Sequence, residues 1–263
     1  MADRLETRLE SLFATSRPVA LITASGAPRI GNQIVRSLAL RGYRLVVHCH
    51  RSVEQARQTV DELQAAGHEA IVVTADLTDE HAVKEMFGHA QRSFGRLDAL
   101  VNCASIWTKK PMDEVTAADL RDHFDANVIS TFLCCQQAGL VMVEQPTGGA
   151  IVNLGDWATR RPYLDYAAYF ASKGSIPTIT RDFAHELADR NPRIRVNAIL
   201  PGPVMLSANL SESERKAAIE ATLLKREGNP SNVADAAVFL IENDFITGVC
   251  LPVDGGRSIY TPA

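Results

Sequence analysis

A tyrosine and a lysine, Tyr169 and Lys173, stand four residues apart at the end of the stretch from Asn153 to Lys173. In a helix, that spacing places the phenol and the ammonium group on the same face. A phenol in water has a pKa near ~10, so alone it is a poor proton donor or acceptor at neutral pH. A neighbouring cation favours the phenolate and lowers that pKa, which suits the pair to proton transfer. A surface tyrosine and lysine would show the same spacing, so the rest of the chain must decide between the two interpretations.

Length and composition are those of an ordinary globular protein. The chain has 263 residues, 46% of them hydrophobic, which is enough to bury a full core. A net charge of -4 gives no electrostatic reason to expect a nucleic-acid partner. The N-terminus is charged throughout and no stretch approaches the ~20 apolar residues of a membrane span, so we expect neither a signal peptide nor a membrane partner. The five cysteines form no CxxC pair and no metal-ligand spacing, which predicts no metal site and a reducing, cytoplasmic location.

Short apolar runs alternate with helical patterns along most of the chain. We expect buried strands at residues 20–22, 44–48, 70–74, 99–102, 150–154, 194–199 and 248–253. The helices between them are expected at 29–41, from Ser52 to Gly67, after a cap at Thr78, at 117–143 and up to Asp189. This alternation predicts an α/β fold, a single doubly wound domain whose seven-stranded parallel sheet is flanked by helices. Residues 18–263 would form this domain, and residues 1–17 an amphipathic N-terminal extension.

In such a sheet the ligand lies where the parallel strands end. The first strand-to-helix turn, Thr23–Gly31, is rich in small residues that let the backbone approach a pyrophosphate, and the following helix N-terminus favours negative charge. It is not a GxGxxG motif, and a tight turn without a ligand would look similar. The second strand ends in His48–Ser52, where no carboxylate is present to bind the ribose of NAD. Arg51 and Ser52 can instead hold a 2′-phosphate, which favours NADP.

These motifs, in this order, resemble those of the short-chain dehydrogenase/reductase superfamily over residues 18–260. The matching segments are the turn at 23–31, Asp76-Leu77, Asn102–Ser105, Asn127, Tyr169-x-x-x-Lys173, Pro201–Pro203 and Asp254–Gly256. The resemblance implies a Rossmann-type fold and a nicotinamide cofactor.

Within that superfamily the chain resembles the pteridine reductase branch, which includes the bacterial dihydromonapterin reductases. Arg29 before Ile30-Gly31, the run His48–Ser52 and the segment Asn102–Trp107 are similar to this branch. Most telling is Asp156, thirteen residues before Tyr169, where the wider superfamily has a serine. A carboxylate would repel the developing oxyanion of a ketone, whereas beside a pterin it can orient the tyrosine and assist protonation of a ring nitrogen. The loop 157–165 and the residues Ala24-Ser25 depart from the branch.

The resemblance implies hydride transfer from NADPH to a C=N bond of a pterin. Tyr169 would donate the proton, while Lys173 lowers its pKa and binds the nicotinamide ribose. Asn127 would kink its helix and hold a water molecule in the proton relay. Asp156 would complete the catalytic set. Trp107 would stack on the flat pterin.

The implied binding residues fall into two sets. Those for NADPH or NADP+ are Ser25, Arg29, Ile30, His50, Arg51, Ser52, Asp76, Leu77, Asn102, Ala104, Ser105, Tyr169, Lys173, Pro201 and Gly202. Those for the substrate are Arg29, Ser105, Trp107, Asp156 and Tyr169. Residues 203–226 would form a mobile lid, and helices 117–143 and 166–189 would build a homotetramer.

Two other functions stay open. The first is an NADPH-dependent reductase of another carbonyl or imine, for example a 3-oxoacyl thioester or a quinone; Asp156 opposes the acyl substrate, but the unmatched loop 157–165 leaves it possible. The second is a non-catalytic NADP-binding regulator, which would have no need to keep Asn127, Tyr169 and Lys173.

Overall fold

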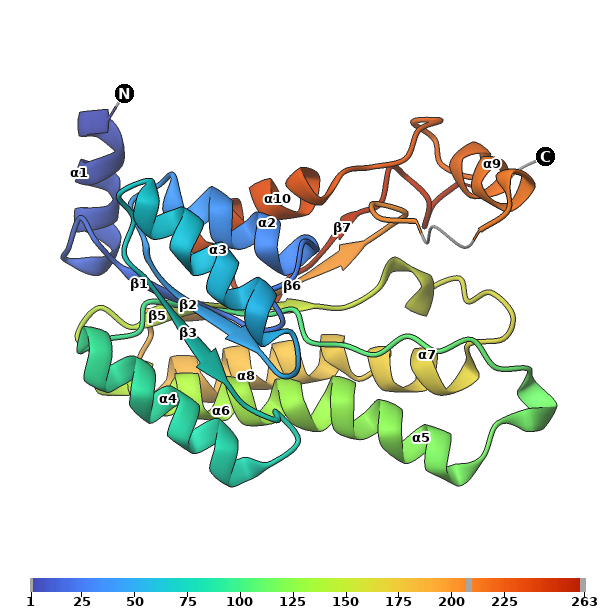
Figure 1. Cartoon of the computed structure of the whole chain (residues 1–263), viewed down its shortest axis with the longest axis horizontal. Helices are drawn as coiled ribbons and strands as arrows, with labels where there is room; N and C mark the ends of the chain where they lie inside the picture. The colour runs from blue at the N-terminus through green and yellow to red at the C-terminus, as the bar shows by residue number, and fades with distance from the viewer. Residues whose placement is uncertain (1, 207–209, 261–263) are drawn as a thin grey trace.

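The sheet contains seven parallel strands in the part of the chain that the computed structural model describes, residues 2–206 and 210–260 (Figure 1). They are β1 (Val19–Ile22), β2 (Arg44–Cys49), β3 (Ala70–Thr74), β4 (Ala99–Asn102), β5 (Gly149–Leu154), β6 (Ile194–Pro201) and β7 (Cys250–Val253). Their order is β3-β2-β1-β4-β5-β6-β7, so the direction of strand addition reverses between β1 and β4. The predicted Rossmann-type α/β fold is therefore confirmed, and the reversal marks the place where such sheets bind ligands.

Aliphatic residues form these strands because both faces of the sheet are covered. All residues of β1 and β5 are buried, which is why β1 is a continuous apolar run and β5 is apolar except for Asn153, rather than alternating. The register aligns the strand ends: Ile22 pairs with Val101, and Val101 pairs with Val152. The residues that follow β1, β4 and β5 therefore meet at one edge of the sheet.

Helices cover the two faces of the sheet in separate layers (Figure 1). One layer contains α2 (Ile30–Ala39), α3 (Val53–Ala65) and α10 (Pro230–Glu242). The other contains α4 (Glu80–Phe94), α6 (Ser130–Val143) and α8 (Ile176–Arg190). Each layer packs its apolar side chains against one face of the sheet, and two hydrophobic cores result.

The N-terminal segment is a helix, α1 (Ala2–Phe13), that packs on the first of these cores. Leu9 and Phe13 are 1% and 2% exposed, as the amphipathic pattern predicts. The Arg96 guanidinium donates to the carbonyl oxygen of Phe13 at 2.6 Å and holds the end of the helix in place. α1 lies at the end of the sheet away from α9 (Glu212–Glu220) and the chain terminus (Figure 1).

Two predicted helix caps differ in the structure. Ser52 occupies the N-cap position of α3, but its side chain makes no capping hydrogen bond. The N-cap of α4 is Asp79, not Thr78: the Asp79 carboxylate accepts from the backbone N–H groups of His81 and Ala82 at 2.8 and 3.1 Å. Thr78 instead donates its hydroxyl to Asp76 at 2.8 Å, because the aspartate precedes it in the same turn.

The expected helix over 117–143 contains a change of helix type. It consists of α5 (Ala117–Phe124), a π-helical turn η2 (Asp125–Ile129) and α6. By length and composition this run could also cross a membrane, contrary to the expectation that no stretch approaches that length. Its Cys134, Ala138 and Met142 side chains are fully buried in the protein core, which explains the apolar composition. The expected helix over 166–189 is likewise two helices, α7 (Ala167–Lys173) and α8.

Candidate active site

Tyr169 and Asp156 meet at the edge of the sheet where the strands end. The Tyr169 hydroxyl donates to Asp156 Oδ2 at 2.6 Å. Asp156 follows β5 after one residue, and its other oxygen, Oδ1, accepts from the backbone N–H of Ala158 at 2.7 Å. This second bond begins the short 3-10 turn η3 (Trp157–Thr159) and fixes the orientation of the carboxylate. Both oxygens therefore accept from donors, as a carboxylate can.

Burial sets the protonation states of this group. Burial and then the charge of Asp156 raise the pKa of Tyr169 far above its ordinary value. Burial also raises the pKa of Asp156, although the Tyr169 hydrogen bond opposes this effect. Burial lowers the pKa of Lys173 to about 8, and the charge of Asp156 opposes that change. The phenol is thus protonated at neutral pH.

The expectation that Lys173 lowers the Tyr169 pKa is wrong for this arrangement. The Lys173 ammonium group donates to the carbonyl oxygen of Leu154 at 2.7 Å. Asp156, which the turn after β5 brings to the phenol, is the charge that raises the pKa of Tyr169, in addition to burial. The pair on one face of α7 is still formed, since Tyr169 and Lys173 are both buried, at 6% and 3% exposure.

Asn127 lies in the π-helical turn η2 and connects two parts of the site. Its side-chain oxygen accepts from the Ile106 N–H at 2.8 Å, and its amide group donates to the Ile106 carbonyl at 3.1 Å. The amide also donates to the Ser172 hydroxyl at 2.9 Å, which joins the loop after β4 to α7. The expected irregularity in the helix is present. Because the side chain is bonded to protein, a relay water would have to use other atoms.

The first turn after β1 is held by His48, a residue of β2 to which sequence reasoning gave no role. Its Nδ1 accepts from the Ala24 N–H at 3.0 Å, and its Nε2 lies 3.1 Å from the Ala75 carbonyl oxygen, to which it donates. Burial lowers the pKa of His48 to about 4, so the ring is neutral, as these two bonds require. The bond to Ala24 holds that residue at φ +49°, a left-handed conformation uncommon for alanine. The signal in the sequence was a polar residue within a buried apolar strand.

Two further polar residues tie the strand ends together. Thr23 Oγ1 accepts from the backbone N–H groups of Cys103 and Ala104 at 2.8 and 3.0 Å, which joins the turn after β1 to the loop after β4. Asn102, an expected cofactor residue, is buried and donates to Asn153 Oδ1 at 2.9 Å. Its side chain therefore connects β4 to β5 inside the protein.

The end of β2 presents positive charge. Arg51 and His50 are exposed there, and Ser52 is half-buried. Arg29, also exposed, occupies the N-cap position of α2. Among the residues that the structure describes, neither Arg29 nor Arg51 lies within ion-pair distance of a carboxylate. Unpaired guanidinium groups beside a helix N-terminus fit a phosphate-bearing nucleotide.

The close approach of backbone in the first turn supports the same fit. A Cβ atom added at Gly31 would lie 2.9 Å from the carbonyl oxygen of Ala24, and one at Gly26 would lie 2.6 Å from Ala56 Cβ. Only glycine lets α2 and α3 begin this close to the turn. The other expected cofactor residues lie at the neighbouring strand ends: Asp76 and Leu77 after β3, Ser105 after β4, and Pro201 and Gly202 at the end of β6.

Trp107 lies beside the aromatic side chains of the loop before α7. Its indole ring stacks on Tyr166, with centroids 4.8 Å apart and planes 11° apart. The indole N–H donates to the Tyr163 hydroxyl at 3.3 Å. Tyr163 also packs edge-on against Phe170, with centroids 4.8 Å apart. One face of Trp107 is therefore already covered by Tyr166, the residue that follows the loop 157–165.

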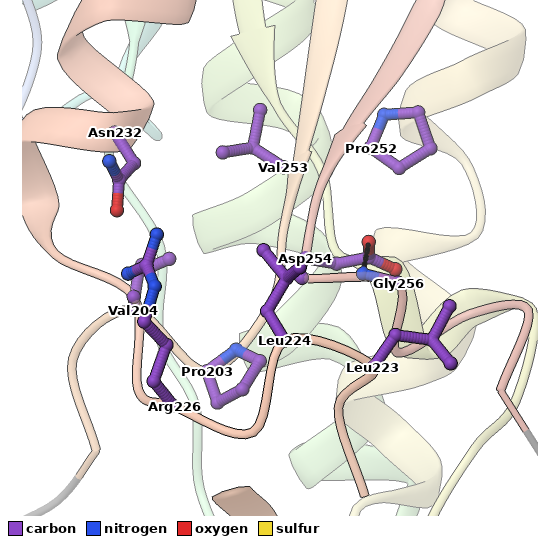
Figure 2. A pocket seen from close by; sticks show the side chains of 12 residues that line it. Pro203, Val204, Leu223, Leu224, Arg226, Asn232, Pro252, Val253, Asp254 and Gly256 are labelled. Carbon is purple, nitrogen blue, oxygen red and sulfur yellow. Dashed lines mark hydrogen bonds between the residues drawn. The ribbon is translucent and has the colours of Figure 1, made fainter.

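The expected lid, residues 203–226, encloses a cavity at its base. The backbone N–H groups of Leu223 and Leu224 donate to the Gly255 carbonyl at 2.9 and 3.2 Å, which ties the lid to the segment after β7. Figure 2 shows the cavity of about 420 Å³ between these leucines, Pro203 and Val253. Its lining includes neither Tyr169 nor Asp156. Within the lid, residues 207–209 lie outside the described residues.

A family model, sequence relatives and solved structures all match most of this chain. Residues 26–258 match the family described as Enoyl-(Acyl carrier protein) reductase. The 3-oxoacyl-[acyl-carrier-protein] reductase of Bos taurus is 33% identical over 236 residues, covering 89% of this chain and 95% of the relative. The 3beta-hydroxysteroid dehydrogenase 1 of Eggerthella lenta is 31% identical, covering 91% and 94%. These two relatives bear the names of different substrates, so similarity alone does not select one.

A solved structure repeats the whole fold. A candidate gluconate dehydrogenase of Agrobacterium tumefaciens superposes with a TM-score of 0.87 and 31% identity, covering 93% of this chain and 97% of its own. The arrangement of seven strands and their helices is thus shared with an oxidoreductase scaffold along almost its entire length.

Proposed function

The chain belongs to the short-chain dehydrogenase/reductase superfamily, and from this membership we propose that it is an NADPH-dependent reductase of a C=N bond in a pterin. The reaction would convert a dihydropteridine to a tetrahydropteridine. One observation carries the proposal: the partner of the Tyr169 hydroxyl is the carboxylate of Asp156, at 2.6 Å. A carboxylate beside the reacting atom opposes formation of an oxyanion, but it stabilises the positive charge of a ring nitrogen that accepts a proton.

The residues of this chain would move one proton. Tyr169 donates its hydroxyl proton to the ring nitrogen, and the negative charge of Asp156 favours the protonated C=N group, which is the form that accepts hydride. When bound, NADPH supplies the hydride to the adjacent carbon, so that C=N becomes CH–NH. Lys173 would hold the nicotinamide ribose. Its pKa of about 8 is close to neutral pH, so it can also return a proton to Tyr169 after the reaction.

The choice of NADPH over NADH rests on the end of β2. Arg51, Ser52 and His50 would bind the 2′-phosphate, and Arg29 would lie near the diphosphate. In the described part of the chain no carboxylate stands at the end of β2 itself; Asp76, which follows β3, is 3.8 Å from His50. The five cysteines are all free thiols, in keeping with the cytoplasmic location that we propose.

We also propose that residues 203–226 close over the substrate and that helices α6 and α8 build a homotetramer. The lid contains α9, whose N-cap Ser211 accepts from the Glu214 N–H. Phe132 and Leu140 are 40% and 45% exposed on the outer face of α6, beside a groove of about 330 Å³ shared with α8. Apolar side chains of this size on one face are typical of a subunit interface.

A second candidate is reduction of a 3-oxoacyl thioester. It is favoured by the similarity to the Bos taurus reductase of that name. Asp156 opposes it, because a ketone oxygen needs a hydrogen-bond donor in the transition state and this carboxylate accepts.

The test is oxidation of NADPH by the purified protein. Dihydrobiopterin and dihydromonapterin are compared with an acetoacetyl thioester, and NADH replaces NADPH in a parallel series. We expect turnover of the pterins with NADPH and little with NADH or the thioester. Tyr169→Phe should lower kcat by about 10²- to 10⁴-fold, the usual contribution of a general acid. Full activity of that variant would exclude the proposed proton donor, and turnover of the thioester alone would support the second candidate. Turnover of any substrate would exclude a non-catalytic regulator.

A further inference from the structure

Two arginines, Arg161 and Arg257, lie together between the loop before α7 and the chain end. An Nη1 hydrogen of Arg161 is directed at the carbonyl oxygen of Arg257 at 3.4 Å and at that of Tyr260. Burial, and then the charge of Arg161, lowers the pKa of Arg257. Two positive charges are therefore held close to each other, which is unfavourable unless an anion is added.

Arg257 lies over the ring of Trp157, the residue that follows Asp156. Its guanidinium carbon is 5.0 Å from the centroid of that ring. Its Nη1 donates to the carbonyl oxygen of Ala218 in α9 at 2.7 Å. Arg257 thus touches both the loop that carries Asp156 and the expected lid. Figure 1 shows α9 and the loop before α7 at the same end of the molecule.

No acid balances the two arginines in the part of the chain that the structure describes. Other arginines, such as Arg36, Arg96 and Arg215, form ion pairs with carboxylates. Within residues 2–206 and 210–260, the side chains of Arg161 and Arg257 contact carbonyl oxygens and an aromatic ring and form no ion pair. Each guanidinium has five N–H donors, and these contacts use Nη1 alone, so most of the donors stay available.

We propose that Arg161 and Arg257 form an anion-recognition pair for a substrate that carries a carboxylate or phosphate group remote from its reduced ring. The planar ring lies at Asp156 and Tyr169, and the anionic end extends along Trp157 to the two guanidinium groups, which match such oxygens in a bidentate manner. This inference rests on the proposed function and narrows its substrate to an anionic member of the class.

A purely structural role for the arginines makes a different prediction. If they only clasp the lid and the chain end to the loop, their loss weakens binding of neutral and anionic pterins equally. If they recognise an anion, their loss affects the anionic pterin alone and the effect disappears at high salt, because the added ions screen the charges.

The experiment compares KM values for neutral dihydrobiopterin, for dihydrofolate with its two carboxylates, and for a dihydropterin monophosphate. The variants are Arg257→Gln and Arg161→Gln, which remove the charge but keep an N–H donor. The matched control is Arg160→Gln, a change of the same charge at an exposed neighbour of Arg161. We expect each test variant to raise KM for the better anionic substrate about tenfold, the effect of about 1.4 kcal/mol in one charge-assisted contact. KM for dihydrobiopterin and for NADPH should change less than twofold, and Arg160→Gln should resemble the wild type.

The anion that the pair prefers, carboxylate or phosphate, is the one carried by the substrate whose KM rises more in the arginine variants. Equal effects on neutral and anionic pterins, or an equal effect in Arg160→Gln, would overturn the proposal. A second readout does not depend on turnover: p-aminobenzoylglutamate, an anion without a pterin ring, should quench tryptophan fluorescence through Trp157 in the wild type and not in Arg257→Gln. Absence of that quenching in the wild type also overturns the pair. Failure of all pterins to react, with quenching intact, would overturn the proposed function and leave the anion site standing.

Discussion

Replacing Asp156 by asparagine tests the chemistry with almost no change of shape. The side chain keeps its size and an oxygen that accepts from the Ala158 N–H, a bond of 2.7 Å in the wild type, so η3 should be retained. The second position becomes an NH₂ group that donates toward the Tyr169 hydroxyl instead of accepting from it. One negative charge and one hydrogen-bond acceptor are lost together.

The magnitude follows from the length of the bond. At 2.6 Å the Tyr169–Asp156 contact has the distance of a charge-assisted O–H···O⁻ bond. Such a bond contributes about 1.5–3 kcal/mol, so its loss should lower the Tyr169 pKa by about 1 to 2 units. The lower pKa makes Tyr169 a stronger acid, but protonation of the ring nitrogen loses the electrostatic support of the carboxylate. We expect this loss to be the larger effect, so kcat for a dihydropterin should fall about 10²- to 10⁴-fold.

The assay is NADPH oxidation at saturating dihydrobiopterin, with Asp165→Asn as the control. Asp165 lies in the same loop, is partly exposed and has φ +69°, a conformation that asparagine tolerates, so this variant removes equal charge away from the phenol. Asp156→Ser is measured in parallel and should gain activity on an acetoacetyl thioester while losing the pterin. A rate for Asp156→Asn within threefold of the wild type, with an unchanged melting temperature, would refute the reasoning.

Three more predictions concern the cofactor, the pH profile and stability. Arg51→Gln should raise KM for NADPH about 10- to 100-fold, because it removes about 1.5–3 kcal/mol of binding to the 2′-phosphate, and KM for NADH should change little. The control Arg57→Gln, on the surface of α3, should leave both KM values unchanged in steady-state assays. Since the Lys173 pKa is about 8, kcat/KM for NADPH should fall with increasing pH above that value as the ammonium loses its proton, and pH–rate measurements that stay flat to pH 10 would contradict it. His48 has a pKa of about 4 in the folded protein and ordinarily 6.5, so the unfolded chain binds the extra proton first and stability is lost as pH falls from 6.5 to 4. The loss should reach about 3 kcal/mol in urea unfolding, and His48→Gln should show a smaller pH dependence.

The strands could be predicted from sequence because burial on both faces of the sheet requires runs of apolar residues, which are visible in the sequence. Runs such as Val19–Ile22 contain nothing but apolar residues, and the structure buries every one of them. The helix starts were less certain, because Thr78 and Asp79 are both good caps and only the direction of the chain decides between them. The structure selects Asp79, while Thr78 closes a turn with Asp76.

Most side-chain partners were the part that sequence could not supply. The pairing of Asp156 with Tyr169 is an exception: the resemblance predicted that Asp156 orients the tyrosine, and the turn after β5 and α7 bring the two side chains to 2.6 Å. Trp107 was predicted to face a ligand, but its stacking on Tyr166 depends on the path of a loop with no periodic pattern. The role of His48 could not be predicted for a different reason. Its ring accepts a hydrogen bond from the backbone of another segment, and every residue has a similar backbone, so the sequence does not identify the partner.

The π-helical turn at Asp125–Ile129 makes the site sensitive to the number of residues in it, not only to their kind. Each residue of an α-helix turns the chain by about 100° about the helix axis. Deleting one residue from this turn would therefore rotate α5 by about that angle relative to α6. Asn127 would then lose its bonds to Ile106 and Ser172, although no contacting residue had been changed. The extra residue of the π-helical turn fixes the rotation of α5 relative to α6. Insertions or deletions in this turn should therefore be tolerated far less than substitutions of exposed residues such as Asp125.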